Sequence, residues 1–128
     1  MFSSMLNPNF VLLYVADPLK SAAFYAELLG RKPVEAQKTF ALFVLESGLK
    51  LGLWLKEDVL PAPSREIGGS ELCIPVESAE RVQKIHDAWA ERALPIAQRP
   101  TEMDFGHTFV ALDPDGHRLR VFAPNDKQ

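Results

Sequence analysis

Two segments of this chain begin in the same way, and this repetition constrains the fold more than any other feature of the sequence. Each segment opens with an apolar, β-prone run that leads into a capped helix, over residues 11–25 and again over 72–85, and a hairpin pattern follows later. Val15 and Val76 hold corresponding places before the two helices and are 61 positions apart, about the length of one β-α-β-β-β unit. The sequence therefore predicts an α+β fold made of two such units.

The first unit has clear boundary signals. Asp17 followed by Pro18 is typical of a helix N-cap and first helical residue, and Gly30 is typical of a left-handed C-cap. A helix is therefore expected over residues 19–29. The strands of this unit are expected at residues 10–15, 38–45 and 49–55, with a turn at 46–49 between the last two.

The second unit repeats this order after a polar connection, which is marked by two prolines and the pair Gly68–Gly69. Ser78 is expected to cap the second helix, in which Val82, Ile85 and Trp89 fall on one face, so Trp89 is interpreted as core packing. The other elements expected here are strands at residues 72–76 and 96–99, a loop at 100–106, and a hairpin at 107–122 that turns at 113–116.

Composition excludes several classes of function. With 128 residues and 47% hydrophobic content, the chain can bury one good core, so a single domain is expected. A net charge of -3 and the lack of a basic run argue against nucleic acid as a partner. No apolar stretch nears the ~20 residues of a membrane span, and residues 1–8 lack the features of an export signal, so a cytoplasmic location without a membrane partner is expected. The single cysteine, Cys73, excludes an internal disulfide and is interpreted as a buried, inert thiol.

Several short motifs carry a resemblance to a known family. They are Val15-Ala16-Asp17 followed by Ser21 and Phe24-Tyr25, then Leu28-Leu29-Gly30, and finally Asp113-Pro114-Asp115-Gly116-His117. With these motifs the sequence resembles the vicinal oxygen chelate superfamily, which includes glyoxalase I, extradiol dioxygenases, fosfomycin-modifying enzymes and bleomycin-binding resistance proteins. The resemblance implies one domain over residues 1–128 with modules at about 9–57 and 70–124 and a linker at about 58–69. It also implies curved mixed sheets that form a concave pocket, and a homodimer.

In that family, His, Gln or Glu side chains on the strands form a cage that holds a metal ion. The matching positions in this sequence are Phe10, Gly52, Glu71 and Arg120. Only Glu71 could bind a divalent cation, whereas such sites need three or more protein ligands, and the charge of Arg120 would repel the ion. No metal and no other cofactor is therefore expected. The histidines lie away from these positions and are interpreted as surface or turn residues: His86, His107 and His117.

Strand alternation predicts which side chains take the place of the cage in the first module. Phe10 and Tyr14 are expected on the concave face of the first strand. In the following hairpin, Phe43 is expected opposite Gly52, on the same face as Trp54. Gly52 would then leave space between aromatic walls.

The second module is expected to add polar groups to the pocket. Val110 is expected opposite Arg120 and Thr108 opposite Phe122, while Glu71 enters from the other side. Two residues of the loop at 100–106 are expected to cover the pocket. The predicted ligand-binding set is Phe10, Tyr14, Phe43, Trp54, Glu71, Met103, Phe105, Thr108, Val110 and Arg120.

Aromatic walls with one fixed cation suit a flat, conjugated ligand. Within the family, the nearest likeness is to metal-free, phenazine-antibiotic resistance-type binding proteins. The leading interpretation is metal-independent binding and sequestration of a planar aromatic small molecule, with Arg120 orienting an anionic group and no catalytic residue. One alternative is a superfamily enzyme, a lyase, isomerase or group transferase, that uses Glu71 as a base or an unexpected metal. Another is that Glu71 and Arg120 pair with each other while the aromatic residues pack a closed core.

Overall fold

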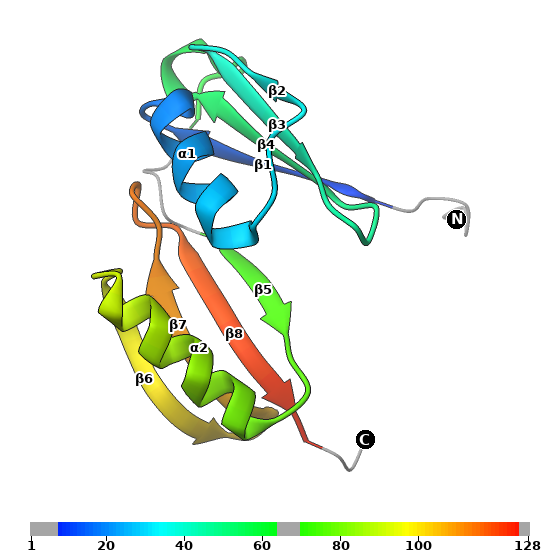
Figure 1. Cartoon of the computed structure of the whole chain (residues 1–128). Coiled ribbons are helices and arrows are strands. Elements are labelled where there is room, and N and C mark those ends of the chain that lie inside the picture. Colours follow the sequence, from blue (N-terminus) through cyan, green and yellow to red (C-terminus); the bar gives the residue numbers. More distant parts are fainter. Residues whose placement is uncertain (1–7, 64–69, 126–128) are drawn as a thin grey trace, which may run out of the picture. The chain divides into compact units, whose positions relative to one another are not determined.

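Each of the two units expected from the sequence is built around one four-stranded mixed sheet (Figure 1). The computed structural model describes residues 8–63 and 70–125 of the chain. These residues belong to unit 1, residues 1–64, and unit 2, residues 65–128. The start of the chain at 1–7 and the pair Gly68–Gly69 of the expected connection lie outside the described residues.

Unit 1 follows the order β-α-β-β-β and then adds one short helix. Its elements are β1 (Phe10–Val15), α1 (Pro18–Leu29), β2 (Glu35–Ala36), β3 (Phe40–Val44), β4 (Lys50–Leu55) and the 3-10 helix η1 (Lys56–Asp58). The strand order is β1-β4-β3-β2, with β1 parallel to β4 and the other pairs antiparallel. The predicted caps of α1 are confirmed, since the Asp17 carboxylate accepts the Lys20 N–H and Gly30 has a φ of 63°.

Unit 2 repeats the same order and the same sheet topology. Its elements are β5 (Glu71–Pro75), α2 (Ala79–Glu91), β6 (Ile96–Met103), β7 (Gly106–Leu112) and β8 (Arg118–Pro124). The strand order is β5-β8-β7-β6, with β5 parallel to β8. Ser78 caps α2 by accepting the Arg81 N–H, and Trp89 packs edge-on against the buried ring of Phe109 at 5.4 Å, so both predictions are confirmed. The predicted α+β fold of two β-α-β-β-β units is the fold observed.

The short elements β2 and η1 were not located from the sequence, and β6 is longer than expected. Residues 100–103, expected in a loop, continue β6, and only Asp104 and Phe105 separate this strand from β7. Two register shifts, between Ile96 and Gln98 and between Gln98 and Thr101, give β6 extra residues against β7. Because β6 is the edge strand of its sheet, it tolerates Pro100, which has no backbone N–H to donate.

Among the described residues, no helix is long and apolar enough to cross a bilayer.

Candidate functional site

Helices α1 and α2 each pack on one face of their own sheet, and most of the candidate site residues lie on the other, helix-free face. In β1 of unit 1, Leu13 and Val15 are buried against the core, so Phe10, Leu12 and Tyr14 alternate onto the helix-free face. Phe10 and Leu12 remain 45% and 40% exposed. Exposed side chains of this size are costly to leave in water, which makes this face a candidate contact surface.

The first hairpin has a register that differs from the prediction by one residue. Leu42 lies opposite Gly52 and Phe40 opposite Trp54, whereas Phe43 pairs with Leu51. The Leu45 N–H donates to Leu49 O at 2.8 Å, so the loop between the two strands has three residues, 46–48. The predicted register requires a loop with an even number of residues. A one-residue shift moves every side chain to the opposite face of a strand. The predicted pairing of Phe43 with Gly52 is therefore wrong, and Phe43 is a fully buried core residue.

Gly52 also differs from the expectation, because its neighbours close over it. A Cβ atom on Gly52 would lie 2.7 Å from Leu12 Cδ2, 3.0 Å from Phe10 Cε1 and 3.2 Å from Phe40 Cε1. The glycine therefore lets three apolar side chains converge and does not leave an empty floor. Beside them, the rings of Tyr14 and Trp54 meet edge to face with centroids 6.4 Å apart. We call this set, Phe10, Leu12, Tyr14, Phe40 and Trp54, the aromatic face of unit 1.

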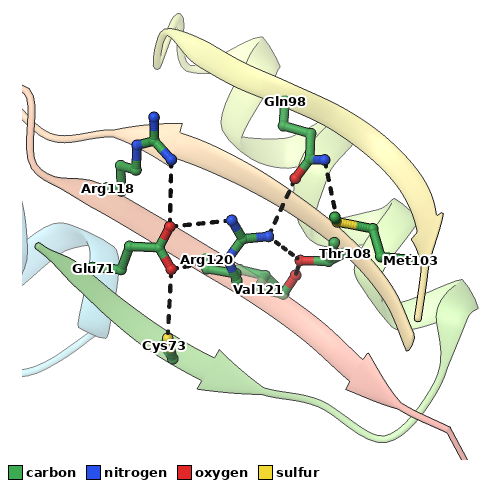
Figure 2. Close-up of polar contacts among 8 residues, drawn as sticks. All are labelled: Glu71, Cys73, Gln98, Met103, Thr108, Arg118, Arg120 and Val121. Carbon is green, nitrogen blue, oxygen red and sulfur yellow. Dashed lines mark hydrogen bonds and ion pairs between the residues drawn. The ribbon is translucent and has the colours of Figure 1, made fainter. Parts of the chain in front are cut away.

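The second hairpin has the predicted register, with Val110 opposite Arg120 and Thr108 opposite Phe122. On β5, Glu71 and Cys73 alternate with Leu72 and Ile74, and Cys73 lies next to Arg120 in the parallel ladder. Strands β5, β6, β7 and β8 all contribute polar side chains to the helix-free face of unit 2, and Figure 2 shows these side chains.

Arg120 is the centre of this polar group. Its Nε donates to Glu71 Oε1 at 3.0 Å and its Nη2 to Glu71 Oε2 at 3.1 Å, which is a bidentate ion pair (Figure 2). Its Nη1 donates to Gln98 Oε1 at 3.2 Å and to Thr108 Oγ1 at 3.3 Å. The guanidinium also lies over the Phe105 ring, 5.8 Å from its centroid. The sequence left open whether Glu71 pairs with Arg120, and the structure shows that it does.

Sequence reasoning missed two members of this group. Arg118 Nη1 lies 3.5 Å from Glu71 Oε2, and Gln98 bonds Arg120 from the edge strand. The i, i+2 spacing of Arg118 and Arg120 in one strand was a usable signal, because it places both on one face. Gln98 had no such signal, since only the register shifts of β6 place it opposite Val110.

The structure also places Cys73 and two residues of the predicted loop, Met103 and Phe105. Cys73 is exposed, with Sγ 4.0 Å from Glu71 Oε1, so the expectation of a buried thiol is wrong. The reason is its position on the helix-free side of an edge strand. Met103 ends β6 and its Sδ accepts the Gln98 amide at 3.4 Å, while the ring of Phe105 contacts that of Phe122 edge to face at 6.1 Å.

The contacts of Glu71 set its protonation. The hydrogen bond from Arg120 is the main cause that lowers the pKa of the Glu71 carboxyl, and the charges of Arg120 and Arg118 act in the same direction. Partial burial opposes the shift without cancelling it. Reciprocally, the bond to Glu71 raises the pKa of Arg120. A carboxylate with a lowered pKa is a weak proton acceptor, which disfavours Glu71 as a general base.

The substitution Glu71→Gln is expected to remove part of the acid sensitivity of the fold. Because the folded pKa of Glu71 lies below its ordinary value of 4.5, the carboxylate stabilises the protein fully above that pH and loses this effect as pH falls through the folded pKa. The difference in free energy of unfolding between wild type and E71Q should therefore be constant above about pH 5 and shrink below it. Urea unfolding followed by circular dichroism at a series of pH values measures this difference.

Asp87→Asn is the matched control for this experiment. A hydrogen bond from His86, and then one from Gln83, lowers the pKa of Asp87, but this carboxylate lies on α2 and not in the polar group. D87N should alter acid stability, and adding E71Q to the D87N protein should give the same pH-dependent difference as adding it to wild type. A difference that stays constant down to about pH 3 would show that Glu71 is not held by the arginines.

The residues at the four family metal-ligand positions do not fit a metal ion. Phe10 and Gly52 offer no side-chain donor atom, and both carboxylate oxygens of Glu71 accept hydrogen bonds from Arg120. Across residues 8–63 and 70–125, no three or more His, Cys, Asp or Glu side chains are grouped so that they could hold a metal ion. Two histidines pair instead with neighbouring carboxylates, His86 with Asp87 and His107 with Glu102, and His117 is a buried turn residue.

Known proteins resemble this chain over most of its length. A protein of Agrobacterium tumefaciens, solved by solution NMR, is 46% identical, with 94% of this chain and 99% of that chain covered and a TM-score of 0.84. The phenazine antibiotic resistance protein EhpR of Enterobacter agglomerans is 28% identical over 121 residues, 91% of each chain. A crystal structure of a glyoxalase/bleomycin resistance protein/dioxygenase from Nocardioides has a TM-score of 0.83 at 18% identity, covering 99% of this chain and 89% of that one, which is a likeness of fold.

A family model also matches, and it covers residues 7–121 of the chain. Together with the fold of the two units, this match means that the chain belongs to the glyoxalase/bleomycin resistance protein/dioxygenase superfamily.

Proposed function

We propose that this protein binds and sequesters a planar aromatic small molecule that carries an anionic group, and that it does so without a metal or other cofactor. The observation that carries the proposal is the aromatic face of unit 1, where Phe10 and Leu12 are 45% and 40% exposed beside Tyr14 and Trp54. Aromatic rings favour stacked or edge-to-face contact with flat, conjugated molecules. A relative is named a phenazine antibiotic resistance protein, which supports a protective role by sequestration.

The polar group of unit 2 supports the anionic part of the proposal. Glu71, Arg118 and Arg120 hold one carboxylate and two guanidinium groups, so the group carries a surplus of one positive charge at neutral pH. A fixed positive charge favours a ligand with a carboxylate or similar group. The proposal includes the homodimer that the family resemblance implies.

Tryptophan fluorescence tests the binding proposal. The protein has two tryptophans, Trp54 on the aromatic face and Trp89 in the core of unit 2. Titration with phenazine, corrected for absorption by the ligand, is expected to quench Trp54 saturably and to leave Trp89 largely unquenched. Trp54→Ala should abolish the saturable quenching and weaken binding measured by calorimetry by about tenfold, because one aromatic contact contributes roughly 0.5–1.5 kcal/mol beyond its buried area.

Trp89→Phe is the control, because it removes the second emitter and keeps Trp54. This variant should show the same dissociation constant as wild type and a larger fractional quench. Calorimetry that detects no binding of phenazine, phenazine-1-carboxylate or quinoline-2-carboxylate by wild type would contradict the proposal.

A further inference from the structure

The polar group of unit 2 contains two arginines that differ sharply in how far their hydrogen-bonding capacity is used. Four N–H···O bonds join Arg120 to Glu71, Gln98 and Thr108, and its side chain is only 17% exposed. A guanidinium has five N–H donors, so Arg120 has one left to offer. Its charge is already balanced by the carboxylate of Glu71.

Arg118 is in a different situation. Its side chain is 54% exposed, and it has one ion pair within the described part of the chain, a separation of 3.5 Å between its Nη1 and Glu71 Oε2. That carboxylate is already held by the shorter bonds from Arg120. The surplus positive charge of the group is therefore most available at Arg118, whose remaining N–H donors can bind an incoming group.

A hollow of about 250 Å³ lies beside this side chain, within unit 2. It is lined by Ala97, Gln98, Val110, Arg118 and Arg120. The amide of Gln98 lies at this hollow, and its N–H donates to Met103 Sδ at 3.4 Å (Figure 2), whereas Val110 is 1% exposed and offers almost no surface. Thioether sulfur is a weak acceptor, so this amide can exchange it for a carboxylate oxygen with a gain in bond strength.

We infer that Arg118, with the amide of Gln98, binds the carboxylate of an aromatic monocarboxylate ligand, while Arg120 acts as a fixed support held by Glu71. This inference rests on the proposed function and assigns the ligand class and the residue that selects it. The volume of the hollow is below the 300–1,000 Å³ that typical ligand pockets enclose, so it accommodates the carboxylate end of the ligand and not a whole tricyclic ring system.

Isothermal titration calorimetry with two matched compounds tests the inference. Phenazine-1-carboxylate and phenazine-1-carboxamide have the same ring system and differ in charge. Wild type is expected to bind the carboxylate about tenfold more tightly, as one charge-assisted contact at a half-exposed site allows. In Arg118→Gln this preference should fall to about one, with the affinity for the carboxamide unchanged.

Arg81→Gln is the matched control, since it removes the same charge from unit 2 on the exposed side of α2. It should keep the tenfold preference, and Arg118→Lys should keep part of it because the charge remains. An R118Q variant that still prefers the carboxylate would overturn the inference. Equal binding of both compounds by wild type would also overturn it and leave the proposed aromatic binding intact, whereas failure to bind either compound or phenazine itself would overturn both.

Discussion

Alanine in place of Gly106 is expected to lower the free energy of unfolding by roughly 2–4 kcal/mol, because the added methyl group meets backbone and not a side chain. Gly106 begins β7 with a φ of 149°, a conformation that residues with a Cβ rarely adopt. A Cβ atom there would overlap the carbonyl oxygen of Ala123 in β8. That carbonyl belongs to the antiparallel ladder in which Gly106 pairs with Pro124, so it cannot move without breaking the sheet.

Gly52→Ala is the matched comparison and should change the free energy of unfolding much less. Its Cβ would meet side-chain atoms of Leu12, Phe10 and Phe40 and no backbone atom, and no positive φ is involved. Glycine in a strand is destabilising by roughly 0.5–1 kcal/mol relative to alanine, so G52A should change stability by less than about 1 kcal/mol in either direction.

Chemical denaturation of the three proteins distinguishes these expectations, and thermal melts add a second measure. For a chain of 128 residues, 1 kcal/mol corresponds to roughly 3–5 °C in Tm, so G106A should melt several degrees below both wild type and G52A. Equal destabilisation by the two substitutions would mean that the side chains over Gly52 are as rigid as the backbone beside Gly106.

The position of Gly106 also matters for the polar group. The turn before it holds Phe105, whose ring lies under the Arg120 guanidinium, and the Asn125 N–H donates to the Phe105 carbonyl at 3.0 Å. The close approach of β7 and β8 at Gly106 therefore fixes the ring that supports the arginine.

The two hairpins show what the sequence could and could not predict. The second has a specific turn, in which the Asp113 carboxylate accepts the N–H groups of Asp115 and His117 at 2.9 and 2.8 Å. That chemistry sets the loop length, so the pairing of Val110 with Arg120 was predictable. The first turn has only Ser47 and Gly48 as signals, which fit loops of different length, and the register could not be fixed to one residue.

The polar group was predictable only in part, for a related reason. The alternation of β5 and β8 placed Glu71 and Arg120 on one face, and it would have placed Arg118 there too. The contribution of Gln98 depends on two irregularities in β6, and nothing in the local sequence marks a bulge there. Likewise, whether Arg120 faces a ligand or a carboxylate depends on the parallel pairing of β5 with β8, which joins positions 49 residues apart.

Removing Arg120 alone is expected to be more harmful than removing it together with Glu71. In Arg120→Met, Gln98 Oε1 loses its donor and Glu71 keeps the longer contacts to Arg118 and Cys73. A polar group left without its partner costs about 1–3 kcal/mol, and the 17% and 29% exposure of the two side chains keeps the loss below the 3–5 kcal/mol of a fully buried pair.

The double variant Glu71→Met with Arg120→Met should recover part of that loss, because the partly buried carboxylate no longer lacks its main partner and apolar side chains of similar length take the place of the pair. Arg118 loses Glu71 but is 54% exposed to water, and Gln98 Oε1 still lacks its donor. The free energies of unfolding of wild type, both single variants and the double variant form a cycle, and the coupling energy is expected to be about 1–2 kcal/mol. The double variant should also lose the acid sensitivity assigned to Glu71, which ties the stability measurement to the ion pair itself. If the losses of the two single variants simply add, the pair contributes no mutual stabilisation, and the role of Glu71 in holding Arg120 would be contradicted.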